Sequence, residues 1–321
     1  MKIYAARNND LSIRRKASSG GMFSVLALKV LNEGGVVYGA SFNDEWTVVH
    51  TRTDNPADLC RLYGSKYVYS TLGNSVQDAI KDLKDGRKVL FSGTPCQAAI
   101  MRKFAGDHEN LIIVEVVCHG TPEAKYWTRY LDEVCHRHNR SVKDISAINF
   151  RDKRTGWKRY SLTISFSDGE EITSFHGDNP YYGAFLHNFT LREACFSCPF
   201  KYPNGSQADI TLGDFWKLGT IAPDLDNDEG TSLVIARTEK GERLLIGIEL
   251  IREFAYDDIV KCNPGVASAS MRPSKYDKFK KRAADESRSI INLFEAFIRP
   301  SLTLRIKISL KKLLSVLYRR N

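Results

Sequence analysis

The sequence predicts an α/β fold: a mixed or parallel sheet in the first part, an additional antiparallel β-containing part that carries cysteines, and a basic helical C-terminal tail. Three observations support this prediction. Two buried β-branched runs enclose a helix-compatible stretch, alternating apolar and polar residues follow residue 145, and the chain becomes basic after residue 271. The expected divisions are therefore residues 1–145, 146–271 and 272–321.

The chain opens with a predicted helix and strand. Gly20 and Gly21 precede Met22–Asn32, whose apolar residues recur at helical spacing. Gly34 and Gly35 then lead into an apolar run over residues 36–40, which is typical of a strand.

A strand–helix–strand unit follows. Residues 88–91 and 111–117 are rich in β-branched residues, as buried strands are, and a helix-compatible stretch begins near Gln97. If the two strands are parallel neighbours, the cysteines that follow them, Cys96 and Cys118, lie together at the carboxyl edge of the sheet. Open α/β folds bind their ligands at that edge.

The middle of the chain is predicted to be richer in strands. Alternation indicates strands over residues 147–151, 161–167 and 171–175, with Asp168–Gly169 as a hairpin turn. A helical stretch over 181–191 precedes two further strand candidates, 209–215 and 232–237.

Composition excludes several classes of protein. The 321 residues are 42% hydrophobic and 26% charged, which excludes disordered and collagenous chains. No uninterrupted apolar run is long enough for a transmembrane helix, and the N-terminus lacks a secretory layout, so we expect a cytoplasmic protein with reduced thiols. Seven cysteines in that setting indicate metal or redox chemistry before disulfides.

The strongest local signal is the pair Cys195 and Cys198, three positions apart in a predicted turn. Zinc and iron–sulfur sites usually need four soft ligands. Cys96 and Cys118 are the best additional ligands because each follows a strand in a Gly/Thr/Pro turn. The remaining three, Cys60, Cys135 and Cys262, lack such turns and are interpreted as small buried hydrophobic residues.

Three chemistries remain open for these cysteines. Four thiolates suit an iron–sulfur cluster, and they also suit tetrahedral zinc. Alternatively, Cys96 alone is a nucleophile activated by a helix N-terminus and by His119, which would leave the second cysteine pair unrelated.

Five ordered motifs make the chain recognisable between residues 3 and 270. They are Ala17–Phe23, Gly64–Tyr67, Gly93–Gln97, Cys118–Gly120, and Leu191–Lys201 with Asp209–Trp216. Together they resemble the coenzyme F420 hydrogenase/dehydrogenase beta-subunit family. The resemblance implies an iron–sulfur oxidoreductase subunit with FAD, which passes electrons between the flavin and a deazaflavin, a ferredoxin or another acceptor. Relatives with an N-terminal ferredoxin-like module hold further cysteines there, so we expect a single cluster and an external electron carrier here.

The resemblance also implies roles for individual residues. The ligands of one 4Fe-4S cluster would be Cys96, Cys118, Cys195 and Cys198. The FAD contacts would be Ser18, Ser19, Gly20, Gly21, Ser65, Lys66, Gly93, Thr94 and Gln97. Lys66 would place a positive charge near the flavin, and His119 would tune the cluster or shuttle a proton.

Two of these assignments have plainer alternatives. Ser18 or Ser19 would equally serve as an ordinary helix N-cap. Lys66 would equally be a solvated surface lysine.

The positive charge is confined to the tail. The chain carries 47 Lys and Arg against 38 Asp and Glu, a net +9; residues 272–321 hold 14 and 4 of these, leaving 33 and 34 for the rest. Residues 301–318 place leucines and isoleucines on one helical stripe beside lysines, which is typical of a helix lying on anionic lipid. A helix docked on the protein is the alternative. No basic-aromatic motif supports binding of nucleic acid.

The sequence therefore predicts a flavin- and iron–sulfur-dependent oxidoreductase, with a role in surface polysaccharide biosynthesis as one setting. A non-catalytic zinc-binding or scaffold protein of cell-surface glycan assembly is the alternative from another class.

Overall fold

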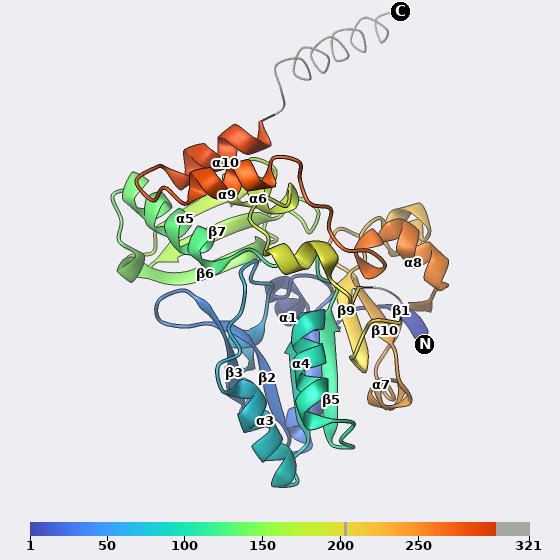
Figure 1. Cartoon of the computed structure of the whole chain (residues 1–321). Helices are drawn as coiled ribbons and strands as arrows, with labels where there is room; N and C mark the ends of the chain where they lie inside the picture. The colour runs from blue at the N-terminus through green and yellow to red at the C-terminus, as the bar shows by residue number, and fades with distance from the viewer. Residues whose placement is uncertain (202–203, 300–321) are drawn as a thin grey trace, which may run out of the picture.

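The computed structural model describes residues 1–201 and 204–299 and contains two β-sheets (Figure 1). The larger sheet has eight strands in the order β11-β1-β10-β9-β5-β4-β2-β3, and the smaller has the order β6-β7-β8. The strands are β1 (Lys2–Ala6), β2 (Val36–Phe42), β3 (Val48–Thr53), β4 (Val89–Gly93), β5 (Leu111–Val116), β6 (Ile145–Asp152), β7 (Ser161–Phe166), β8 (Glu171–Phe175), β9 (Ile210–Asp214), β10 (Ser232–Ala236) and β11 (Arg252–Glu253).

The helices divide between the two sheets. Those beside the larger sheet are α1 (Leu11–Lys16), α2 (Met22–Asn32), α3 (Ser75–Lys84), α4 (Pro95–Ala105), α7 (Glu239–Leu244) and α8 (Tyr256–Cys262). Those beside the smaller sheet are α5 (Ala124–Arg137), α6 (Pro180–Leu186), α9 (Tyr276–Ala283) and α10 (Ile290–Ile298). Short 3-10 helices are η1 (Pro56–Leu62), η2 (Val142–Asp144), η3 (Glu193–Ser197), η4 (Leu218–Thr220), η5 (Pro223–Leu225) and η6 (Pro264–Val266).

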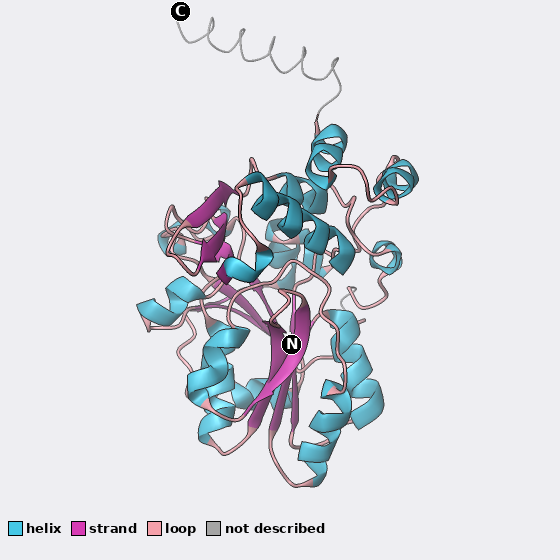
Figure 2. Cartoon of the chain, turned by 90° about the vertical axis from the view of Figure 1, so that its left-hand side faces the viewer, coloured by secondary structure: helices cyan, strands magenta, loops and turns pink. Residues whose placement is uncertain are grey.

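The centre of the larger sheet is parallel: β2, β4, β5 and β9 run in one direction, and antiparallel strands flank them. Helices cover both faces (Figure 2). On β4, Leu90 packs in the core under α2, whereas Val89 and Phe91 pack under α3 and α4. These strands are apolar on both sides because both sides are buried.

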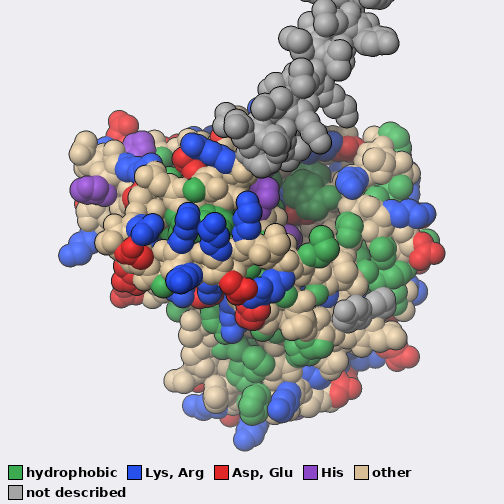
Figure 3. All heavy atoms as spheres, turned by 45° about the horizontal axis from the view of Figure 1, so that its top comes forward, with side chains coloured by type: hydrophobic (Ala, Val, Ile, Leu, Met, Phe, Trp, Pro, Cys, Tyr) green, Lys and Arg blue, Asp and Glu red, His purple; other side chains and the backbone are tan. Residues whose placement is uncertain are grey.

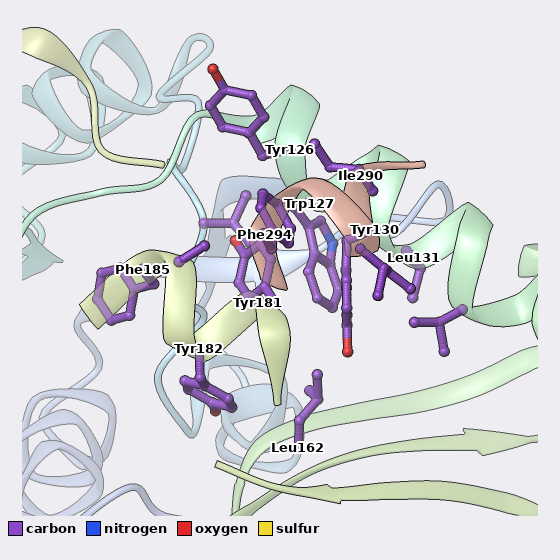
Figure 4. Packing of buried hydrophobic residues seen from close by; sticks show 14 of the residues in the cluster. Tyr126, Trp127, Tyr130, Leu131, Leu162, Tyr181, Tyr182, Phe185, Ile290 and Phe294 are labelled. Atoms are coloured by element: carbon purple, nitrogen blue, oxygen red, sulfur yellow. The ribbon is translucent and has the colours of Figure 1, made fainter. Parts of the chain in front are cut away.

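The smaller sheet packs against a helical layer through an aromatic core (Figure 4). Trp127 of α5 is fully buried and lies 4.8 Å from the ring of Phe150 in β6, measured between ring centroids. Tyr181 of α6 and Phe294 of α10 pack against the same cluster, so α5, α6 and α10 share one core with the sheet.

The predicted fold class is confirmed. The parallel pairing of β4 with β5 is also confirmed, as is the β6-β7-β8 meander. The helix expected over 181–191 ends earlier, at Leu186. Strands β9 and β10 join the larger sheet, and β1 was not expected. The predicted divisions at 145 and 271 stay a prediction, and the tail helix over 301–318 lies outside the described residues.

One buried ion pair connects the two sheets. Arg151 at the end of β6 is 2% exposed, and its Nη1 donates to Asp214 Oδ2 of β9 over 2.7 Å. The same nitrogen donates to Tyr67 Oη at 3.0 Å, and the guanidinium lies 4.1 Å from the ring centroid of Tyr160. Burial alone would lower the pKa of Arg151, but the attraction of Asp214 more than offsets it, so the pKa is raised above its ordinary value.

Removing this cation should destabilise the protein strongly. Arg151→Met leaves the Asp214 carboxylate without its buried partner, and we expect the free energy of unfolding to fall by about 3–5 kcal/mol. Urea unfolding followed by circular dichroism measures this change. Lys143→Met, at an exposed position, is the control and should change stability by less than about 0.5 kcal/mol. Equal effects of the two substitutions would contradict the role given to Arg151.

Candidate functional site

The first cysteine of the site, Cys96, lies in the first turn of α4, directly after β4. The sequence starts the helix here because Thr94 and Gln97 form a reciprocal capping box and Pro95 occupies the first turn. The Thr94 Oγ1 atom lies 3.2 Å from Cys96 Sγ. Cys118 follows the parallel neighbour β5, so both cysteines reach the same edge of the sheet, as expected.

The second pair, Cys195 and Cys198, lies in and just after η3, which packs on the segment following Cys118. A bridge between Pro122 and Leu191 joins the two segments, and Thr121 N donates to Cys195 Sγ over 3.4 Å. Gly120 allows this approach, because its φ is +146° and a Cβ there would lie 2.7 Å from a methyl group of Leu191.

The four thiols are close enough to affect one another's ionisation. The pKa of Cys118 is raised to about 12, mainly by burial; the nearby Cys195 and Cys96 thiols also raise it, whereas Lys201 and the Gly120 backbone lower it. Burial likewise raises the pKa of Cys198, again with contributions from Cys96 and Cys195. The four cysteines that the sequence grouped therefore lie in one neighbourhood.

The donor set fits a sulfur-ligated metal group. Backbone N–H groups point at three of the sulfurs: those of Gly120, Thr121 and Phe200 at Cys118, Cys195 and Cys198. Such donors, with a nearby cation, stabilise thiolates once a metal has displaced their protons. In the described part of the chain, no three His, Cys, Asp or Glu side chains form a site for a single metal ion.

The cation is Lys201, to which the sequence analysis gave no role. Its side chain is 4% exposed, and Nζ donates to the carbonyl of His119 over 2.8 Å. In the sequence, Lys201 is marked only by its place two residues after Pro199. Its burial depends on tertiary packing, which the sequence pattern does not show. The His119 side chain has partners of its own: Nε2 donates to Asn188 Oδ1 at 2.6 Å, and the ring contacts Phe185.

The Ser/Gly motif before α2 is brought to the Gly64–Lys66 motif. Ser18 Oγ accepts a hydrogen bond from Ser65 N over 2.5 Å. Ser19 Oγ instead donates to the Thr231 carbonyl, at 2.7 Å. A side chain at Gly20 would collide with backbone atoms of β1 and β10 at 2.6 Å, so this glycine permits close packing. Neither serine caps α2, whose N-cap is Gly21 with φ +83°.

A pocket of about 200 Å³ opens beside these motifs. Tyr63, Gly64, Ser65 and Lys66 form one wall, and Phe150 of β6 helps to form another. Lys66 Nζ donates to the Arg61 and Tyr63 carbonyls, at 3.1 and 2.9 Å. Burial of this ammonium group lowers the pKa of Lys66 to about 7. The Lys66 side chain is half-buried, and its role in binding stays a prediction.

His50 of β3 connects this pocket to the start of α4, and sequence analysis missed it. Its Nε2 donates to the Ser92 carbonyl at 2.9 Å, and Nδ1 lies 2.7 Å from Ser70 Oγ. Burial, together with the charge of Lys66, holds the pKa of His50 at about 4, so the ring is neutral near pH 7. A Cβ on Gly93 would lie 3.4 Å from His50 Nε2.

Thr94 and Gln97, two of the predicted FAD contacts, form hydrogen bonds within the protein. The Thr94 hydroxyl donates to Gln97 Oε1 over 3.0 Å, and Gln97 Nε2 donates to the Ser70 carbonyl at 2.9 Å. Gln97 is therefore engaged in holding the turn that carries Cys96.

The cysteines outside the site behave differently from one another. Cys135 and Cys262 are buried, as expected. Cys60 is exposed and lies at the pocket beside Lys66, so its interpretation as a buried hydrophobic residue is wrong. The reason is that η1 turns only Leu59 and Leu62 inward.

Comparison with known proteins identifies the family. The family described as coenzyme F420 hydrogenase/dehydrogenase, beta subunit, matches in two parts, its N-terminal region over residues 3–77 and its C-terminal region over residues 86–260. A curated relative, the coenzyme F420-dependent sulfite reductase of Methanocaldococcus jannaschii, is 23% identical over 303 residues. That match covers 87% of this chain and 40% of the relative, so the chain spans about two fifths of the relative's length.

A solved structure has the same fold. The F420-reducing [NiFe] hydrogenase complex from Methanosarcina barkeri contains a chain that aligns with a TM-score of 0.54 and 17% identity, covering 90% of this chain and 89% of that one. At that identity the likeness concerns the fold alone. Because the two family regions together span most of the described sequence in order, the chain belongs to the coenzyme F420 hydrogenase/dehydrogenase beta-subunit family of oxidoreductases.

Proposed function

We propose that the protein is a flavin- and iron–sulfur-dependent oxidoreductase. It moves electrons between FAD, one 4Fe-4S cluster and an external carrier. The ligands of the cluster are Cys96, Cys118, Cys195 and Cys198. One observation carries the proposal: four cysteines from three segments lie close enough to affect one another's ionisation, two of them directly after the parallel strands β4 and β5. In this proposal residues from both 1–145 and 146–271 form the pocket, and the Cys195–Cys198 turn belongs to 146–271, so the site lies between the two.

The pocket residues have separable tasks. FAD, when bound, would exchange hydride at one face and release electrons singly, which makes it the converter between two-electron and one-electron chemistry. Ser65, fixed by its bond to Ser18, orients the loop that carries Lys66. Lys66 is held in place by two carbonyls, so its ammonium group can hold a proton opposite negative charge on the ligand.

The start of α4 holds the two binding regions close together. Gln97 fixes Thr94 through the capping box, and Cys96 lies between these two residues. His50 stabilises the same turn by donating a hydrogen bond to the Ser92 carbonyl. Because the charge of Lys66 reaches His50, we expect a group in the pocket and a group on the cysteines to lie near each other, which would favour electron transfer.

The partners are proposed from chemistry and from the relatives. The two relatives above are named for coenzyme F420, a deazaflavin, so a deazaflavin-type or ferredoxin-type carrier is the proposed partner of this chain. A task in surface polysaccharide biosynthesis is the proposed setting. The rival proposal, a zinc-binding scaffold without catalysis, makes a different prediction about metal content.

Replacing a cysteine of the site should remove iron. Anaerobically purified protein should be yellow-brown and contain about four irons per chain. Cys195→Ser removes one of four thiolates, so we expect it to lose most of its iron and the absorption band of the cluster. Cys262→Ser is the matched control, because this buried thiol lies in a different core cluster and its polar contacts are the Lys217 carbonyl and the Thr220 hydroxyl. Iron content by colorimetric assay measures both.

Two outcomes would contradict the cluster assignment. One is iron content in Cys195→Ser equal to that of the wild type. The other is a colourless wild-type protein with one zinc per chain, which would favour the scaffold proposal.

Binding of the flavin should take up a proton above neutral pH. Lys66 with a pKa of about 7 is mostly neutral at pH 8, and an anionic ligand that favours its charged form raises this pKa. We therefore expect uptake of nearly one proton on FAD binding at pH 8 and much less at pH 6, where Lys66 is already protonated. Affinity should fall by up to about tenfold per pH unit above 7.

Calorimetry of FAD binding in buffers with different ionisation enthalpies measures this uptake. Lys66→Met should abolish the uptake, whereas Lys16→Met, which changes an exposed lysine at the same pocket, should retain it. Equal uptake in wild type and Lys66→Met would contradict the role of Lys66.

We further propose that the protein is cytoplasmic and that its tail attaches it to an anionic membrane surface. No helix within residues 1–201 and 204–299 is long and apolar enough to span a membrane. Deleting residues 299–321 removes seven Lys and Arg, each worth about 1 kcal/mol near an anionic surface. We expect the deletion to abolish co-sedimentation with phosphatidylserine vesicles and to leave iron and flavin content unchanged. Undiminished vesicle binding would contradict this attachment.

A further inference from the structure

The outer side of the cysteine site lies at the surface. Ser197 and Pro199, on either side of Cys198, are exposed. Two large apolar side chains are exposed close by, Leu186 at 48% and Met271 at 84%. The Met271 carbonyl accepts a hydrogen bond from Asn188, whose Oδ1 in turn contacts His119, so these apolar residues lie next to the loop after Cys118.

Helix α9 begins against the cysteine turn. The ring of Tyr276, its first residue, packs edge-on against Phe196 at 5.0 Å between centroids. Tyr276 Oη also donates to the Leu191 carbonyl over 2.6 Å. Arg272, just before α9, pairs with Glu193 of η3 at 2.8 Å. The helix is therefore fixed to the segment that carries Cys195 and Cys198.

This surface is strongly basic. Residues 186–199 and 270–282, which we name the α9 face, contain seven Lys and Arg and two Asp and Glu, a net +5. Both acids, Glu193 and Asp277, are already paired with Arg272. The remaining exposed cations of α9 and its approach are Lys275, Lys278, Lys281 and Arg282. Lys and Arg side chains gather over this helical layer in Figure 3, and hydrophobic side chains lie beside them.

We propose that the α9 face docks a small acidic protein that carries electrons one at a time. This inference rests on the function proposed above, because the docked carrier would meet the exposed edge of the cluster ligands. Such a partner requires two features that this surface has. Leu186 and Met271 provide apolar contact beside the cysteine site, and the cations next to them can attract and orient an acidic surface.

The reaction balances with two encounters. Each reduced carrier gives up one electron and leaves oxidised, and two carriers supply the electron pair that a hydride needs, with its proton drawn from solvent.

An anionic lipid surface is the alternative partner for a basic face. The cations lie beside the Cys195–Cys198 turn, which favours the carrier. Electron transfer requires a partner close to that turn, whereas binding to a lipid surface does not.

The test measures binding, so it does not depend on turnover. An acidic plant-type [2Fe-2S] ferredoxin is titrated into the full chain by calorimetry at low and at high salt. Lys275→Glu/Lys278→Glu should raise the dissociation constant at low salt at least about tenfold and flatten its salt dependence. Lys81→Glu/Lys84→Glu makes the same charge change on α3, at the opposite end of the molecule, and should have little effect.

Carbodiimide cross-linking of ferredoxin carboxylates to lysines locates the interface. Cross-links at Lys275, Lys278 and Lys281 support the proposal. It is overturned if cross-links map elsewhere, if both double variants bind ferredoxin alike, or if the α9 charges affect phosphatidylserine vesicles and not ferredoxin. Iron content is measured on the same samples: normal iron with unaltered ferredoxin binding in the α9 variant refutes the docking surface alone, whereas absence of iron from the wild type refutes the proposed function.

Discussion

A buried arginine holds the two sheets in place, and the site depends on it. Arg151 lies in the smaller sheet and Asp214 in the larger, and Tyr67, directly after the pocket loop, accepts a hydrogen bond from Arg151. A guanidinium this deeply buried is tolerated only because a carboxylate, a phenol and two aromatic rings surround it. Since the pocket wall comes from both sides of this contact, its shape follows from the pairing.

The second constraint is the direction of the strands. Parallel β4 and β5 end at one edge, so the residues that follow them, Cys96 and Cys118, are delivered together. The second cysteine pair comes from an irregular segment, which is fixed from outside by Thr121 and by Tyr276 of α9. The sheet geometry therefore positions one pair of cysteines, and the helical layer positions the other. The helical layer also supplies the basic surface beside the site.

Much of this arrangement was accessible from sequence because it is local. Strand-end positions predicted Cys96 and Cys118, and the short spacing predicted Cys195 with Cys198. Residues whose roles depend on long-range packing were missed: His50 and Lys201 become buried only when segments distant in sequence fold over them. The same cause made β9 look like part of an antiparallel region, because its parallel partner β5 lies almost a hundred residues earlier.

In the proposed site, four cysteines hold a single iron–sulfur cluster between the pocket and the α9 face. Anomalous diffraction from anaerobically grown crystals, with data on both sides of the iron edge and of the zinc edge, tests it most directly. We expect one compact iron peak bounded by the sulfurs of Cys96, Cys118, Cys195 and Cys198. A zinc peak at these sulfurs, or an iron peak at other residues, would contradict it.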